Sequence, residues 1–78
     1  MSKIIIRNNI RKLRFNTGEM TQQELADKTD TSRQTINAIE SAKYSPSLEL
    51  AFKIAEVFQV KLDEVFYYET PAKYKKKK

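Results

Sequence analysis

The 78-residue sequence contains no cysteine and no histidine, only one glycine and only two prolines. These absences exclude a disulfide framework, a zinc finger, a thiol nucleophile and a serine–histidine catalytic triad. No apolar run approaches the roughly 20 residues that cross a bilayer, and Ile4–Ile6 is too short for the core of a signal peptide. We therefore expect a cytoplasmic protein that is not an enzyme, holds no cofactor or metal and does not bind membranes.

The composition is that of one folded domain with a charged end. Hydrophobic residues make up 40% of the chain and charged residues 32%, which is too apolar for a disordered protein. The net charge of +5 divides into +5 over residues 1–16, −5 over residues 17–70 and +5 over residues 71–78. The body is therefore close to neutral, so any surface that binds a polyanion must be built from a few well-placed cations. We assign residues 1–70 to the domain and residues 71–78 to a basic, disordered tail.

Apolar periodicity and capping residues predict a mainly α-helical domain. Thr21, followed three residues later by Glu24, has the pattern of a capping box, and Ser32 and Ser47 have the pattern of helix N-caps. Gly18 suits a left-handed position after the first helix. The predicted helices cover residues 6–14, 22–28, 33–41, 48–59 and 62–66.

Both ends of the domain carry short segments with strand character. Ile4–Ile6 and Phe66–Tyr68 are rich in β-branched or aromatic residues, and they can pair as a small antiparallel ribbon. The expected fold class is therefore all-α in the main, with five helices and a short two-stranded antiparallel β ribbon made from the chain ends.

The predicted helix 48–59 is more apolar than a surface helix needs to be. With Leu48 as the reference position, its apolar arc extends to about 180°, whereas a stripe of just over about 100° is enough to cover a core. One explanation is that the small core wraps this helix on several sides, and the other is that a second subunit covers it. The second explanation gives these candidates for a dimer interface: Ile4, Ile6, Leu50, Val57, Phe66, Tyr67 and Tyr68.

Residues 21–41 contain two short helices joined by a turn of about three residues, which is a helix-turn-helix arrangement. In such a unit the second helix enters the major groove of DNA and the first braces it across the backbone. The major groove is about 12 Å wide, which matches one helix with its side chains. Small or slim residues at the crossing, here Ala26, Thr31 and Ile36, let the two helices pack.

The sequence also resembles the phage-repressor-like (Xre/Cro) family of DNA-binding domains, over about residues 10–66. The resemblance rests on four blocks: Thr21–Ala26, Thr31–Glu40, Lys43–Ala51 and Lys53–Ala55. It implies a five-helix, lambda-repressor-like fold. The sequence departs from the family pattern at two positions where glycine is common, because Asp30 and Ala42 stand there.

The resemblance implies a role for individual residues. Gln22 would anchor a phosphate at the start of the first helix of the unit. Ser32 would cap the second helix and touch a phosphate, and Lys43 would contact a phosphate from the following loop. Arg14 and Glu40 would form a structural ion pair. Base edges would face Arg33, Gln34, Asn37 and Ala38, with Thr35 at the margin.

Side-chain chemistry agrees with these roles. Arginine binds guanine O6 and N7, glutamine and asparagine pair with adenine, and a small apolar residue meets the thymine methyl group. The alternative is that Arg33 and Gln34 form only a solvated polar face.

We expect a sequence-specific regulator of transcription that binds double-stranded DNA, a dimeric repressor that reads a palindromic operator through the helix starting at Arg33. Its half-sites would lie about 34–36 Å apart. An antitoxin-type protein remains the alternative, with another protein as its main partner and autoregulatory DNA binding as a secondary activity. The lysine-rich tail is either a solubilising end or an arm that adds non-specific affinity for DNA.

Overall fold

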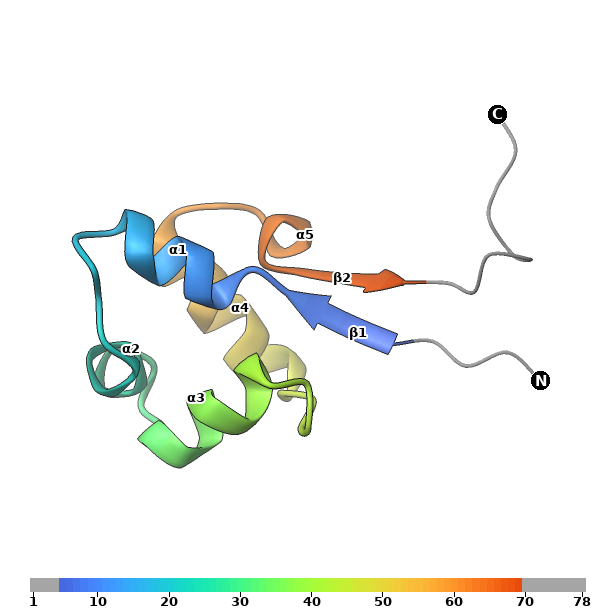
Figure 1. Ribbon diagram of the computed structural model, residues 1–78, viewed down its shortest axis with the longest axis horizontal. Helices are drawn as coiled ribbons and strands as arrows, with labels where there is room; N and C mark the ends of the chain where they lie inside the picture. Colours follow the sequence, from blue (N-terminus) through green and yellow to red (C-terminus); the bar gives the residue numbers. More distant parts are fainter. Residues whose placement is uncertain (1–4, 70–78) are drawn as a thin grey trace.

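Five helices and a two-stranded antiparallel sheet make up the computed structural model, which describes residues 5–69. The expectations for Ile4 and for the tail at 71–78 lie outside the described residues. In chain order the elements are β1 (Ile5–Asn8), α1 (Ile10–Asn16), α2 (Gln22–Thr29), α3 (Arg33–Glu40), α4 (Leu48–Phe58), α5 (Leu62–Val65) and β2 (Phe66–Glu69) (Figure 1). The predicted fold class is confirmed.

The starts of three helices follow from the predicted capping residues. Thr21 Oγ1 accepts a hydrogen bond from the Glu24 backbone N–H, and Glu24 Oε1 accepts one from the Thr21 backbone N–H at 2.8 Å. The hydroxyls of Ser32 and Ser47 accept from the third residue of α3 and α4 in the same way. Each cap satisfies a backbone donor that the helix itself leaves unpaired, which stabilises it by about 1 kcal/mol.

The first helix begins four residues later than its periodicity predicts. Ile6 matches the spacing of Ile10, but Ile6 lies in β1 opposite Tyr68 and is 41% exposed. Asn8 Oδ1 accepts a hydrogen bond from the Ile10 backbone N–H, and the helix starts there. The helix ends at Asn16, and Gly18 follows with a φ of 65°, in the left-handed region where it was expected.

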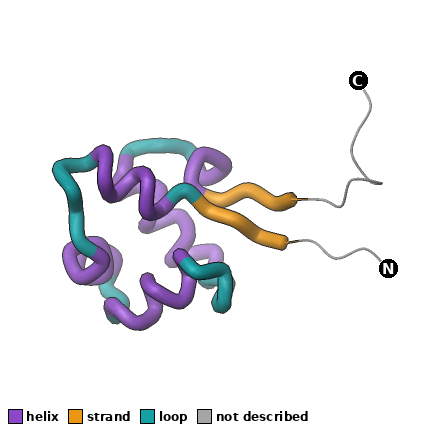
Figure 2. The backbone as a smooth tube through the Cα atoms, viewed as in Figure 1, coloured by secondary structure: helices purple, strands orange, loops and turns teal. Residues whose placement is uncertain are grey.

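The two strands form a ribbon that projects from the helical body (Figure 2). Ile5 pairs with Glu69 and Asn8 with Phe66, so the pairing covers 5–8 and 66–69 and runs further into the domain than predicted. Arg7 Nε donates to Glu69 Oε1 at 2.7 Å across the ribbon. This hydrogen bond and the attraction of the carboxylate raise the pKa of Arg7.

The core lies where all five helices meet. Its largest fully buried apolar side chains come one or two from each helix: Ile10, Leu25, Ile36, Ile39, Ile54 and Val65. Thr29, at the end of α2, is a buried polar residue whose Oγ1 donates to the Leu25 carbonyl at 2.8 Å. Among the helices of residues 5–69, none has both the length and the apolar character needed to cross a membrane.

Candidate nucleic-acid interface

The turn between α2 and α3 fixes where the second helix starts. Asp30, at the position where the family prefers glycine, adopts left-handed geometry with a φ of 64°. The backbone N–H groups of Asp30 and Thr31 both donate to the Ala26 carbonyl, the latter at 2.9 Å. Ser32 then caps α3, so three consecutive residues hold the entry to this helix.

The two sides of α3 differ in chemistry. Ile36 and Ile39 are buried in the core. The opposite side carries the residues that the resemblance assigns to base edges. Exposed on it are Arg33, Gln34 and Asn37, whereas Ala38 on the same side and Thr35 at its margin are half-buried. In Figure 1, α3 lies at the lower edge of the molecule and α5 at the upper edge.

An ion pair joins the end of α3 to α1. Arg14 Nε donates to Glu40 Oε2 at 2.6 Å, and Arg14 Nη2 donates to Glu40 Oε1 at 3.0 Å. The third contact of this guanidinium is Nη1 to the Met20 carbonyl at 2.8 Å, just before α2. The side chains of Arg14 and Glu40 are only 15% and 10% exposed, so the pair is shielded from water. One arginine thereby connects α1, the start of α2 and the end of α3.

Gln22, the first residue of α2, lies over this ion pair. Its Nε2 donates to Glu40 Oε1 and to Asn37 Oδ1, each at 3.2 Å. Both amide hydrogens are therefore used within the protein. Its Oε1 is an acceptor, so in this arrangement the side chain has no N–H to offer an anion, whereas the backbone N–H at the start of α2 has no partner within the helix.

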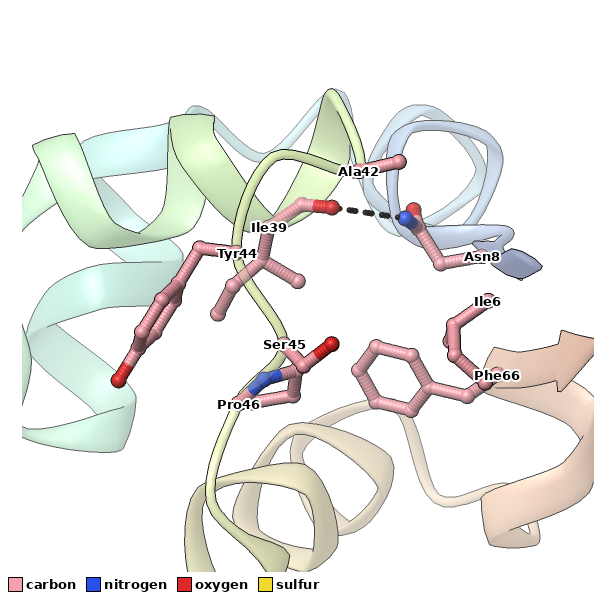
Figure 3. A pocket seen from close by; sticks show the side chains of 8 residues that line it. All are labelled: Ile6, Asn8, Ile39, Ala42, Tyr44, Ser45, Pro46 and Phe66. Atoms are coloured by element: carbon pink, nitrogen blue, oxygen red, sulfur yellow. Dashed lines mark hydrogen bonds between the residues drawn. The ribbon is translucent and has the colours of Figure 1, made fainter. Parts of the chain in front are cut away.

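The loop after α3 runs along the base of the ribbon. Lys43 is exposed in this loop. Asn8 Nδ2 donates to the Ile39 carbonyl at 2.9 Å, inside a pocket that this loop shares with Phe66 (Figure 3). Asn8 thus holds the last turn of α3, a role that the sequence analysis missed. The only signal for it was a polar pair, Asn8 and Asn9, directly before the amphipathic segment that begins at Ile10.

The candidate interface residues of α4 lie against the core. Leu50 and Val57 are half-buried and pack on the core, whereas Leu48 and Phe52 point to solvent with exposures of 67% and 54%. From the ribbon, Ile6, Tyr67 and Tyr68 are exposed and Phe66 is half-buried. The exposed part of this surface is named the apolar face, and its members are Ile6, Leu48, Phe52 and Tyr68.

Across residues 5–69, no three or more acidic, cysteine or histidine side chains gather where they could hold a metal ion. The carboxylates with defined partners serve the structure. Glu24 completes the capping box, Glu40 pairs with Arg14, and Glu69 pairs with Arg7.

Comparisons with known proteins cover most of the chain. The family model HTH_3, described as helix-turn-helix, matches residues 10–65. An uncharacterized HTH-type transcriptional regulator of Methanocaldococcus jannaschii is 60% identical over 50 residues, which are 64% of this chain and 76% of the relative. One from Archaeoglobus fulgidus is 45% identical over 64 residues, covering 82% and 90% of the two chains. The crystal structure of a Bacteroides fragilis protein that is proposed to bind DNA superposes with a TM-score of 0.68 at 27% identity, over 80% of this chain and 98% of that one.

Proposed function

Because the chain belongs to the Xre/Cro-type helix-turn-helix family (HTH_3) of DNA-binding transcriptional regulators, we propose that it is a dimeric repressor that reads a palindromic operator in double-stranded DNA. The observation that carries this proposal is the outer side of α3. It is polar and exposed, and it is backed by the core through Ile36 and Ile39. Such a helix can enter the major groove without unfolding any part of the domain.

In this proposal, the exposed side chains of α3 recognise the base sequence of the DNA. Arg33 at the start of α3 presents a guanidinium suited to guanine O6 and N7, and Gln34 presents an amide suited to adenine. Asn37 lies one turn further along. Ala38 on the same side, and Thr35 at its margin, can contact a thymine methyl group.

Phosphate contacts position the helix and carry no sequence information. In this proposal the backbone N–H of Gln22 and the hydroxyl of Ser32 serve two phosphates, one at each helix start. Lys43 supplies a cation on the loop that follows α3.

The apolar face gives the dimer its contact surface. Leu48 and Phe52 are each more than half exposed. Ile6, which lines one shallow pocket together with Leu48, and its strand partner Tyr68 continue the surface onto the ribbon. Removing apolar surface from water is worth roughly 25 cal/mol per Å². In a two-fold dimer each copy would cover the face of the other, and the two α3 helices would reach half-sites about 34–36 Å apart.

The proposal is tested by selecting bound sequences from a random duplex pool. We expect a two-fold symmetric consensus. Arg33→Ala should lose its preference at one or two base pairs of each half-site and weaken binding by about 1–3 kcal/mol. The control, Lys43→Ala, should weaken binding to all sequences alike. It should also reduce the slope of the logarithm of the binding constant against the logarithm of the salt concentration by about one. Equal affinity of the wild-type protein for every duplex at physiological salt would refute the proposal.

The antitoxin-type alternative rests on the apolar face, since a different protein could cover Leu48 and Phe52 as well as a second copy could. Analytical ultracentrifugation of the purified chain separates the two. A dimer that forms without any added protein favours the repressor. A monomer that pairs one-to-one with a protein encoded beside it favours the alternative.

A further inference from the structure

A groove between α1, the start of α2 and the outer side of α3 contains an arginine with no role in the proposed function. Arg11, Arg14, Gln22, Asn37 and Glu40 are among the residues that line this groove. Arg11 and Asn37 are exposed, whereas Arg14 and Glu40 are shielded from water. The groove therefore reaches from the structural ion pair to a side chain that the proposed function places against DNA.

The two arginines of this groove differ in their partners. Arg14 donates twice to Glu40 and once to the Met20 carbonyl. The charges of Arg14 and Glu40 cancel each other. Among residues 5–69, the Arg11 guanidinium has no carboxylate partner. The groove therefore has one surplus positive charge, and Arg11 carries it.

Cations that could meet DNA are scarce elsewhere on the described part of the chain. Arg7 pairs with Glu69 at 2.7 Å, and Lys53 lies 3.7 Å from Glu49. Lys28 shares a surface hollow with two aspartates. Because residues 1–70 are close to neutral in sum, each remaining cation contributes a large share of the attraction for a polyanion.

Lys12, the next residue along α1, has the same charge as Arg11 but a different position. At about 100° per residue, Arg11 lies about 60° from Arg14 around the helix, whereas Lys12 lies about 160° from it. Lys12 is exposed and does not line the groove. Position, and not charge alone, therefore distinguishes Arg11 from its neighbour.

We propose that this groove binds one phosphodiester of the operator DNA and that Arg11 supplies the charge for the contact. A guanidinium can donate two parallel N–H bonds to phosphate oxygens. The backbone N–H of Gln22, to which the proposed function assigns a phosphate, belongs to a residue that lines the same groove. The two groups would then hold one phosphate, with the N–H fixing its position and Arg11 attracting its charge.

This inference rests on the proposed function, because the groove meets a phosphate of the operator only when α3 lies in the major groove. A phosphate contact carries no sequence information, so Arg11 should strengthen binding to every duplex alike. It should also raise the salt dependence of binding, since each neutralised phosphate releases about 0.9 of a counterion. Both effects differ from those expected of Arg33, which should change base preference.

The first test compares the wild-type protein with Arg11→Gln and Lys12→Gln, which remove the same charge from adjacent exposed positions of α1. Glutamine forms helices about as well as arginine and lysine, so both variants should fold, and thermal unfolding checks this. On the best duplex from the random-pool selection, Arg11→Gln should bind about tenfold more weakly. It should also reduce the slope of the logarithm of the binding constant against the logarithm of the salt concentration by about one. Lys12→Gln should change both quantities far less.

The second test locates the phosphate. Methylphosphonate linkages, which carry no charge, replace the phosphates of the same duplex one at a time. At one position in each half-site the replacement should weaken binding of the wild-type protein about tenfold. It should affect Arg11→Gln much less, because the cation of the contact is already missing. Arg11→Lys should remain sensitive at the same position, since it keeps the charge.

Three outcomes would overturn the inference. They are equal weakening by Arg11→Gln and Lys12→Gln, a methylphosphonate scan in which no position separates the wild-type protein from Arg11→Gln, and a changed base consensus in Arg11→Gln. In each case a wild-type protein that selects one consensus still supports the proposed function. Failure of the proposed function is a separate result, since the wild-type protein would then show no base preference at any position.

Discussion

The outer sides of α3 and α4 present opposite chemistry to water, although both helices bury their inner sides in the same core. The outer side of α3 carries a guanidinium and amides, and α4 exposes Leu48 and Phe52. Water solvates the first surface well and the second poorly. A small domain could keep both helices polar on the outside, and the proposed function assigns the two sides to different partners.

Because α3 and α4 differ in surface chemistry, the free energy of binding to each partner would come from a different source. The polar side of α3 exchanges hydrogen bonds with water for hydrogen bonds with base edges, which yields selectivity more than affinity. The apolar side of α4 gains free energy from any surface that excludes water, so it favours association over discrimination. One domain can therefore read DNA with one helix and hold its second copy with the next.

The largest effect is expected from a charge on the apolar face. Phe52→Lys should leave the fold intact, because the side chain is 54% exposed. In a two-fold dimer the change acts on both copies, each losing about 2 kcal/mol of apolar burial, so the dimer should weaken by about 4 kcal/mol. Sedimentation equilibrium over a range of concentrations measures this change directly.

Phe15→Lys is the matched control for Phe52→Lys. Phe15 is 67% exposed on α1 and outside the apolar face, and the substitution adds the same charge. It should leave the dimer unchanged. If both variants weakened the dimer equally, net charge and not the face would explain the result. A wild-type protein that stayed monomeric at high concentration would refute the proposal that the apolar face forms a dimer contact.

The polar helix of this comparison, α3, depends on the shielded ion pair of Arg14 and Glu40. Arg14→Met leaves Glu40 with a nearly buried charge and only Gln22 as a hydrogen-bond donor. The free energy of unfolding should fall by about 3 kcal/mol, because removing one partner of a buried pair is strongly destabilising. Urea unfolding measures the loss.

Two further variants sharpen this result. Arg7→Met breaks the exposed pair with Glu69, where both side chains are at least half exposed, and stability should change far less. Adding Glu40→Met to Arg14→Met removes the unpaired charge and should restore part of the lost stability. Equal losses for Arg14→Met and Arg7→Met would show that burial of the Arg14 pair does not matter in solution.

The sequence predicts the fold best where the determining contacts are local. Thr21 and Glu24 form their capping box within one turn, so their spacing alone predicts it. Ile6 shows the opposite case. Its spacing from Ile10 fits a helix and its β-branched neighbours fit a strand, and the partner that decides between the two, Tyr68, is 62 residues away along the chain.

The residues of the candidate site divide in the same way, into those that local sequence determines and those that contacts between distant parts of the chain determine. The exposed residues of α3 could be assigned from the helix-turn-helix pattern and the resemblance, because they occupy regular positions on one helix. The contact between Gln22 and Asn37 spans two helices and depends on their side-chain conformations, so no spacing predicts it. The exposure of Leu48 also escaped prediction, since the first residue of α4 lies beyond the end of the core.

The smallest effect concerns the loop that joins the polar helix to the apolar one. Ala42 has a φ of 62°, in the left-handed region, while its N–H donates to the Ile39 carbonyl at 3.0 Å. Left-handed geometry costs an alanine roughly 1 kcal/mol, and glycine adopts it freely but loses more entropy on folding. Ala42→Gly should therefore raise the free energy of unfolding by about 0.5 kcal/mol. Ala38→Gly, the same change inside α3, should lower the free energy of unfolding by about 1 kcal/mol. Urea midpoints that move in opposite directions for the two variants would locate the strain at the junction of the two helices. Two midpoints that both fell would mean that Ala42 is relaxed, and that the junction between α3 and α4 stores no strain.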